Sequence, residues 1–209
     1  MLKVLPINGS PHEKGCTNRA LEEVASAIEA EGIGTEIFHI GRHAIAGCTA
    51  CGYCDRTGEC IVDSDGVNQL LNRLDEYAGV VIGSPVYYAA PNGNLQSFLD
   101  RLFYSGGGRK LAGKPGAAIV SCRRSGATAS FDRLNKYFTI SSMPVVPSTY
   151  WNGVHGKTAA EVEQDLEGLQ TMRNLGRNMA WMVKCFEAGK AIGIEFPEAE
   201  HSYWTNFIR

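Results

Sequence analysis

The stretch "LKVLPINGSPHEKGCTN", residues 2–18, begins as an apolar run and ends as a polar loop that contains glycine, serine and proline. Its first six residues predict a buried strand. After the loop, Leu21, Val24 and Ile28 recur at helical spacing and predict an amphipathic helix. A strand that passes through a short loop into such a helix opens a βαβ unit, in which the next strand runs parallel to the first. This stretch therefore predicts a parallel sheet covered by helices.

The same alternation of strand and helix continues along the chain. Short apolar runs are bounded by glycine, proline, serine or asparagine, and the segments between them have helical periodicity. Parallel neighbours need crossover connections, so the pattern predicts an α/β fold, a doubly wound parallel sheet with helices on both faces. The predicted strands are residues 2–7, 35–40, 79–84, 116–121 and 144–148, and the predicted helices are about residues 18–30, 65–76, 93–104, 127–139 and 158–188.

Pro6 lies inside the first predicted strand. Proline has no N–H to donate to a sheet ladder, so it is unusual in a central strand. We therefore expect either a bulge at Pro6 or a position where the missing N–H faces no partner.

The length and composition indicate one domain. The chain has 209 residues, of which 44% are apolar and 20% charged, and this is enough for one compact core. We assign residues 1–190 to the domain and residues 191–209 to a C-terminal tail. The tail ends in "HSYWTNFIR", and its aromatic side chains are suited to dock on a neighbouring subunit or on its own domain.

Charge and hydropathy argue against several classes of protein. The formal net charge is −2, so the chain has no basic excess for a nucleic-acid backbone. No segment reaches the roughly 18 consecutive apolar residues of a membrane span, and the N-terminus does not read as a secretory leader. We therefore expect a cytoplasmic protein without a nucleic-acid or membrane partner. Seven cysteines, an odd number, favour metal or redox chemistry there over a disulfide framework.

The loop after the first strand, residues 8–18, has the composition of a phosphate cradle. Ser10, Thr17 and Asn18 supply short donors, and the free N–H groups and positive end of the following helix attract an anion. The loop lacks the Gly-Lys-Ser/Thr ending of nucleoside triphosphatases and the G-x-G-x-x-G of dinucleotide sites. A phosphomonoester is the ligand that fits it better. The alternative is a polar turn followed by an ordinary N-cap.

Two further loops follow buried strands, and in parallel sheets such loops meet at one edge. In residues 83–101, Tyr87 and Tyr88 could flank a planar ring system, while prolines stiffen the backbone that faces its rim. These are the requirements of a flavin. The alternative is that the tyrosines cap the core with their hydroxyl groups in water. Residues 121–131 could line the other side of the pocket, although solvated arginines are the default interpretation there.

Four cysteines lie within thirteen residues of the stretch "GCTACGYCDRTGEC", residues 47–60. Their two-residue gaps allow neighbouring thiolates and backbone N–H groups to wrap an iron-sulfur cubane. Structural zinc usually needs two separated cysteine pairs, so zinc is a weaker interpretation. A third interpretation is that reduced thiols simply shape the turn before the next helix. The four residues are Cys48, Cys51, Cys54 and Cys60.

Four motifs together resemble one known family. "NGSP" follows the first strand, "GSPVYY" follows the third, "LDR" lies in the next helix and "GLQTMRNLGRNMAW" in the last. They are similar to those of the NADPH-dependent FMN reductase family, and the resemblance covers residues 3 to about 188. It implies a flavodoxin-like fold with a five-stranded sheet in the order 2-1-3-4-5. The cysteine spacing, followed by "IVDSDGV", is similar to the motif of the iron-sulfur flavoproteins, in which a [4Fe-4S] cluster accompanies FMN.

The resemblance also implies site residues. The sequence departs from the family pattern at His12, where an arginine is usual, and residues 122–126 lack the usual run of glycines. The departures concern one phosphate contact and the outer wall of the flavin site. The cofactor-binding residues implied are Ser10, Pro11, His12, Cys16, Thr17, Asn18, Pro85, Val86, Tyr87, Tyr88, Ser121, Arg124 and Gly126, and the metal ligands implied are Cys48, Cys51, Cys54 and Cys60.

These patterns predict an FMN-dependent oxidoreductase of the NAD(P)H:acceptor or FMN reductase type. The flavin would carry the chemistry, so no catalytic acid or base is required. We expect the cysteine loop at the same sheet edge as the flavin, and a homodimer or homotetramer that brings a cluster near a neighbour's FMN. The first alternative is a non-catalytic electron carrier or redox sensor that acts with an electron-transfer protein. The second is a flavin-free metal-binding module.

One acidic pair is interpreted structurally. Asp63 and Asp65 precede the helix predicted at residues 65–76, where a carboxylate is favourable beside the positive helix end. We therefore expect them to cap that helix.

Overall fold

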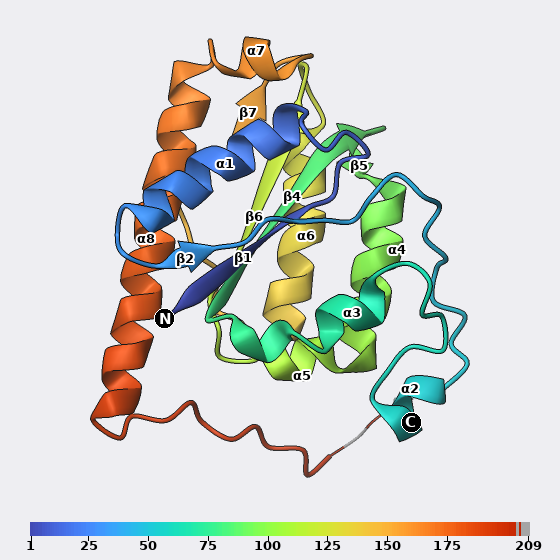
Figure 1. Cartoon of the computed structure of the whole chain (residues 1–209). Helices are drawn as coiled ribbons and strands as arrows, with labels where there is room; N and C mark the ends of the chain where they lie inside the picture. Colours follow the sequence, from blue (N-terminus) through green and yellow to red (C-terminus); the bar gives the residue numbers. More distant parts are fainter. Residues whose placement is uncertain (204, 206–209) are drawn as a thin grey trace.

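The computed structural model describes residues 1–203 and 205, and it contains a central parallel sheet (Figure 1). The strand order is β2-β1-β4-β6-β7, with β3 beside β1 and β5 antiparallel to β4. The predicted order 2-1-3-4-5 is thus confirmed, because β2 and β3 share the second strand's position. The strands are β1 (Lys3–Asn8), β2 (Gly34–Thr35), β3 (Phe38–His39), β4 (Gly79–Tyr87), β5 (Ala90–Pro91), β6 (Gly116–Cys122) and β7 (Gly153–His155).

Helices cover both faces of this sheet, as predicted (Figure 1). The helix predicted at residues 65–76 forms as two short pieces, and a π-helical turn with Gly106 at φ +121° follows the fourth helix. The α-helices are α1 (Cys16–Glu29), α2 (Tyr53–Thr57), α3 (Val67–Leu71), α4 (Gly93–Leu102), α5 (Gly108–Leu111), α6 (Ala127–Ile140), α7 (Ala159–Val162) and α8 (Leu166–Ala191), and the other turns are η1 (Leu74–Glu76) and η2 (Phe103–Gly107).

The core has two parts, one on each side of the sheet. Side chains alternate along a strand, so Leu5 and Ile7 of β1 face α3, α4 and α6, whereas Val4 faces α1 and α8. In β4 the same alternation places Val80 and Val81 on opposite faces. Because both faces are buried, the central strands are almost entirely apolar, which is why they could be recognised in the sequence.

Pro6 is accommodated where β2 and β3 are interrupted. The carbonyl groups of Leu2 and Asn8 accept bonds from Gly34 and Ile40, so the even-numbered residues of β1 face this outer neighbour. The outer ladder pairs only at Gly34–Thr35 and Phe38–His39. The side of Pro6 that lacks an N–H therefore faces the gap between β2 and β3, where no partner needs a donor. This is the second of the two expectations, a missing N–H that faces no partner. The strand predicted over residues 35–40 is split for the same reason.

The fifth strand was predicted at the wrong place. Residues 144–148 contribute one isolated bridge, between Val145 and Gly116, while the strand beside β6 is β7. Pro144 and Pro147 cannot donate to a ladder, so pairing cannot spread along this segment. β7 has three residues, which is too short for a periodic pattern to reveal.

The last predicted helix, residues 158–188, is broken into α7 and α8. The carboxylate of Asp165 accepts a bond of 2.9 Å from the Gly168 N–H and so caps α8. This cap starts a new helix at Leu166. α8 packs along α1 on one face of the sheet (Figure 1).

The part of the tail that is described returns to its own domain. The ring of Phe196 lies so close to Gly113 that a Cβ there would be 2.7 Å from the ring. Docking on a neighbouring subunit stays a prediction, and part of "HSYWTNFIR" (Trp204 and residues 206–209) lies outside the described residues.

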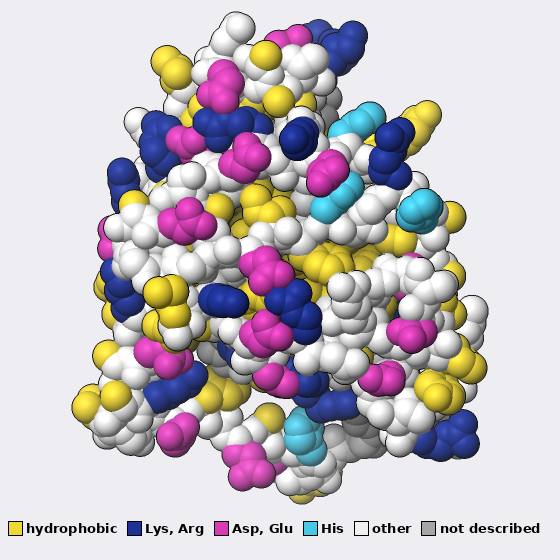
Figure 2. Space-filling model, viewed as in Figure 1, with side chains coloured by type: hydrophobic (Ala, Val, Ile, Leu, Met, Phe, Trp, Pro, Cys, Tyr) yellow, Lys and Arg dark blue, Asp and Glu magenta, His cyan; other side chains and the backbone are white. Residues whose placement is uncertain are grey.

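The surface carries charges of both signs. Figure 2 shows acidic and basic side chains interspersed over the face viewed. None of the helices described is long and apolar enough to cross a membrane.

Candidate functional site

A cavity of about 530 Å³ lies at the carboxyl ends of the central strands. This is the edge at which parallel sheets bind ligands. Loops that follow β1, β4, β6 and β7 supply its walls. The lining residues are Ser10, His12, Lys14, Gly15, Cys16, Thr17, Pro85, Val86, Tyr87, Ser121, Cys122, Arg123, Gly156, Lys157, Thr158 and Ala159.

The β1 loop brings backbone donors to this cavity. Gly15 precedes α1 and has no side chain with which to cap the first-turn N–H groups. Two cavity-lining residues, Cys16 and Thr17, begin the helix, so their N–H groups and the positive helix end face the space. Gly9 allows the loop to lie close to α4, because a Cβ at this position would be 2.4 Å from the Leu95 side chain. The donor set therefore fits a phosphate group.

A pair of hydroxyl groups joins the β1 loop to the β6 loop. The Thr17 and Ser121 oxygens are 2.8 Å apart and buried. One hydroxyl donates to the other, which leaves the second free to donate to a ligand. Both residues line the cavity.

The β4 loop supplies a stiff wall with a strained turn. Pro85, Val86 and Tyr87 line the cavity, and Tyr88 and Ala89 form a two-residue hairpin to β5 with φ values of +51° and +58°. Asn-Gly is the pair that such turns prefer, so this one costs about 1–2 kcal/mol per residue. The turn projects Tyr88 fully into solvent. Strain of this kind is typical of ligand-binding loops.

The structure brings together eight of the thirteen predicted cofactor residues. Pro11, Asn18 and Tyr88 do not line the cavity, and the Asn18 amide is occupied by Glu22 and Asn8. Arg124 and Gly126 line a different cavity, of about 450 Å³, beside β7. The eight that line the first cavity are Ser10, His12, Cys16, Thr17, Pro85, Val86, Tyr87 and Ser121.

Several lining residues were missed in the sequence. Arg123 lies in the loop of residues 121–131, whose arginines are interpreted as solvated, and Lys14 lies in the predicted phosphate loop but is not singled out there. Three more lining residues follow β7, namely Gly156, Lys157 and Thr158. They were missed because the fifth strand was predicted at residues 144–148. The signal was present in "VHGKT", where a glycine, a cation and a hydroxyl follow a short apolar run.

The four clustered cysteines line one small pocket of about 20 Å³. Cys48 and Cys51 are exposed, and Cys54 and Cys60 are half-buried. Burial raises the pKa of the Cys54 thiol, and the charges of Asp55, Cys48 and Cys51 raise it further. Cys48 and Cys51 are therefore near enough to Cys54 for their charge to act on its thiol. Among residues 1–203 and 205, no three His, Cys, Asp or Glu side chains are already spaced to hold a metal ion.

The predicted position of the cysteine loop is wrong. Figure 1 shows α2 at the opposite end of α4 from β5, and the pocket is completed by Tyr104 and Ser105, which follow α4. From Gly93 to Arg101 the helix rises about 12 Å. The cause lies in residues 40–52, which form no helix or strand and run from β3 past α4 to α2 (Figure 1). The cysteine pocket and the large cavity share no lining residue.

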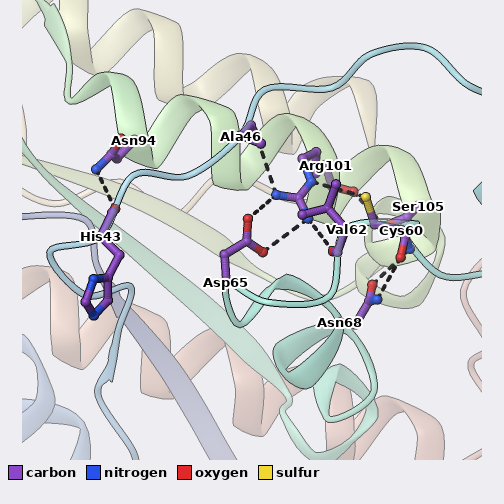
Figure 3. Close-up of polar contacts among 9 residues, drawn as sticks. All are labelled: His43, Ala46, Cys60, Val62, Asp65, Asn68, Asn94, Arg101 and Ser105. Atoms are coloured by element: carbon purple, nitrogen blue, oxygen red, sulfur yellow. Dashed lines mark hydrogen bonds and ion pairs between the residues drawn. The ribbon is translucent and has the colours of Figure 1, made fainter.

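Arg101 lies at the centre of the contacts around the cysteine pocket (Figure 3). Its side chain is 1% exposed and forms an ion pair with Asp65, whose side chain is 8% exposed. The expectation that Asp65 caps the next helix is wrong, because its carboxylate binds Arg101 and the residue before α3 is Gly66. Asp63 does not cap α3 either, since no side chain does so.

The fold defines the class of protein. An archaeal flavodoxin superimposes with a TM-score of 0.59 at 20% identity, covering 88% of this chain and 99% of that one. RosB, solved with bound 8-demethyl-8-formylriboflavin-5'-phosphate, gives a TM-score of 0.68 at 16% identity and covers 100% and 94%. The chain is therefore a flavodoxin-like α/β protein.

Sequence comparison defines the family within that class. The model of the NADPH-dependent FMN reductase family matches residues 2–158. An iron-sulfur flavoprotein of Methanocaldococcus jannaschii is 33% identical over 190 residues, which is 88% of this chain and 98% of the relative. An iron-sulfur flavoprotein of Methanosarcina thermophila is 22% identical over 193 residues, 90% and 99% of the two chains. The chain belongs to the NADPH-dependent FMN reductase family.

Proposed function

We propose that the chain is a cytosolic FMN-dependent oxidoreductase that takes electrons from NAD(P)H and passes them to an acceptor. The observation that carries this proposal is the cavity of about 530 Å³, in which a phosphate-type loop and a tyrosine-bearing loop face each other at the carboxyl edge of the sheet. Open α/β sheets bind their ligands at this place.

Each wall of the cavity has a role in holding FMN. The N–H groups of Cys16 and Thr17, with the hydroxyl of Ser10, bind the phosphate at the helix end. Lys14 and Lys157, two cations on the rim, balance its charge, which compensates for His12 at the position where the family usually has arginine. Pro85, Val86 and Tyr87 hold the ring against the β4 loop.

The protein positions the reactants, and the cofactor supplies the redox chemistry. When bound, FMN accepts a hydride from a reduced nicotinamide or single electrons from another centre. The loops around the cavity exclude bulk water from one side of the ring site and leave the Tyr87 side, which is 44% exposed, open to a second reactant. Orientation of this kind lowers the entropic part of the barrier.

We further propose that Cys48, Cys51, Cys54 and Cys60 hold a [4Fe-4S] cluster. The cysteine pocket fits such a group in the kind, number and shared location of its donors, because four thiols line it. Cys48 and Cys51 are exposed, and in the part of the chain described no three of these thiols are spaced to hold a metal, so the loop would close on the cluster as it binds. In a homodimer or homotetramer, the cluster of one chain would face the flavin of another.

The test is an ultraviolet-visible spectrum of protein purified without oxygen, with iron, zinc and acid-labile sulfide assayed on the same sample. We expect flavin peaks, a broad shoulder near about 400 nm and about four irons per chain. Flavin without metal would overturn the cluster and leave a simple FMN reductase. Protein without flavin would overturn the oxidoreductase itself.

Replacement of one exposed ligand separates the two sites. Cys51→Ser removes the brown chromophore and leaves the yellow FMN spectrum, because the cysteine pocket and the cavity share no residue. Cys185→Ser is the matched control, since Cys185 is an exposed thiol on α8, outside the pocket. Loss of FMN from the Cys51 variant would contradict separate sites.

Turnover distinguishes an enzyme from a carrier. Steady-state assays with NADH and with NADPH, using an artificial acceptor, should show reduction with at least one donor. Sluggish turnover with both would favour the alternative of an electron carrier that acts with a protein partner.

A further inference from the structure

Arg101 contacts both ends of the cysteine loop. Its Nη1 donates to the carbonyl of Ala46 over 3.2 Å, and its Nη2 donates to the carbonyl of Val62 over 2.6 Å. Ala46 precedes the first cysteine of the motif by two residues, and Val62 follows the last by two. A single planar guanidinium therefore joins the two ends of the segment that carries all four thiols (Figure 3).

The same side chain contacts one of the sulfurs. Nε of Arg101 donates to Sγ of Cys60 over 3.1 Å. The other two nitrogens are turned toward Asp65, and Nη2 donates to Oδ1 over 3.1 Å. Asp65 balances the buried charge and fixes the guanidinium plane, so that the Nε–H points at sulfur. Lysine could not make all of these contacts at once, because it lacks the rigid fork.

Cys60 is also held through its backbone. The Cys60 N–H donates to Oδ1 of Asn68 over 2.9 Å, and Nδ2 of Asn68 donates to the Cys60 carbonyl over 2.8 Å. Asn68 is buried and lies in α3. Cys60 is thus fixed at both its main chain and its sulfur, whereas Cys48 and Cys51 lie on the exposed part of the loop.

We propose that Arg101 is a positioning residue for the metal centre: it closes the cysteine loop, presents Cys60 as the fixed ligand and raises the reduction potential of the cluster through the Nε–H···Sγ bond. This inference rests on the cluster in the proposed function. A hydrogen bond to a ligand sulfur withdraws electron density and favours the reduced, more negative cluster. Removal of that bond should therefore make the cluster harder to reduce.

The test uses two variants of the full-length protein. Arg101→Lys keeps the charge opposite Asp65, so it avoids an unpaired buried carboxylate. The double variant R101Q/D65N removes both charges together. Arg73→Lys is the matched control, because Arg73 also forms a two-pronged ion pair, with Glu36, but this pair is partly exposed and Arg73 does not line the cysteine pocket.

Two measurements are made on each protein. Spectroelectrochemical titration gives the midpoint potentials of the cluster and of the flavin. We expect a lower cluster potential in both Arg101 variants, with an unchanged flavin potential, and wild-type values in the Arg73 variant. Amide hydrogen exchange gives the second measurement, and we expect faster exchange confined to residues 44–62 in the Arg101 variants. Loss of iron from the Arg101 variants alone would also support the proposal.

The outcomes separate this inference from the proposed function. Four irons in every protein, with an unchanged cluster potential in the Arg101 variants, would overturn the inference and leave the cluster standing. Wild-type protein without iron would overturn both the cluster and the role of Arg101 at it. Unchanged exchange of residues 44–62 would overturn the closing of the loop.

Discussion

At the scale of single residues, two glycines share a backbone conformation but not an environment. Gly126 and Gly41 have φ values of +87° and +86°, a region that L side chains rarely adopt. A Cβ at Gly126 would lie 3.0 Å from both Ala89 and Val86, whereas a Cβ at Gly41 would meet nothing within 4 Å. Gly126 is therefore the point at which the β6 loop packs against the strained turn of the β4 loop.

This difference makes a matched pair of substitutions. Gly41→Ala should lower the free energy of unfolding by about 1–2 kcal/mol, because it adds backbone strain alone. Gly126→Ala should cost more and should also weaken FMN binding several-fold, since the new methyl displaces the loop that carries Tyr87. Urea unfolding and FMN fluorescence titration measure the two effects. Equal FMN affinity in the two variants would contradict the role of this contact.

At the scale of elements, α1 and α8 are joined by a shared carboxylate. Glu23 of α1 accepts a bond of 2.6 Å from Arg19 of the same helix and another from Arg173 of α8. Burial opposes the ionisation of Glu23, but the two arginines outweigh burial and hold the pKa of Glu23 below its usual value. The helices also touch closely at Gly176, where a Cβ would be 2.6 Å from the Val24 carbonyl.

The lowered pKa of Glu23 makes the stability gained from its contacts with Arg19 and Arg173 depend on pH. A carboxyl whose pKa falls on folding stabilises the fold above its unfolded pKa of about 4.3, and this contribution is lost as pH falls through the folded pKa. Glu23→Gln should therefore cost about 1 kcal/mol at pH 7, and its difference from wild type should vanish in acid. Urea unfolding at a series of pH values measures this. The control Glu31→Gln, which breaks an exposed pair with Lys184, should change little.

At the scale of the whole molecule, an aromatic group is exposed near the edge strand β7. Tyr150 and Trp151 are 64% and 63% exposed, and their ring centroids are 4.7 Å apart. They precede β7, the last strand of the sheet in the order found. Aromatic side chains are enriched at subunit interfaces.

We therefore expect two or four copies of the 22.7 kDa chain in solution. Light scattering coupled to size-exclusion chromatography measures the mass. Trp151→Ser should shift it toward a single chain if this surface is the contact. Trp181→Ser, which changes an equally exposed tryptophan on α8 outside the aromatic pair, should leave it unchanged. A mass of one chain for the wild-type protein would contradict the predicted oligomer.

The sequence by itself determined the fold class and three of the four loops that line the large cavity. Strands buried on both faces are apolar throughout, and helices keep their period, so these signals are local and survive in a single sequence. Because parallel strands end at one edge, the loops after β1, β4 and β6 could be grouped before the structure was known. The strand β7 is too short to be recognised in this way, so Lys157, which follows it, was not predicted as a residue of the cavity.

Only the tertiary structure decided the position of the cysteine loop and the role of Arg101. In the sequence, Arg101 is a cation on an amphipathic helix, and Asp65 is a carboxylate beside a helix start. Asp65 is interpreted locally as a helix cap, and Arg101 is noted only as the end of the motif "LDR", because burial of a charge requires partners that are distant in the chain. Residues 46–65 fold over the end of α4 and supply those partners. Contacts between segments separated by 36 to 55 residues, which no local pattern records, decide this site.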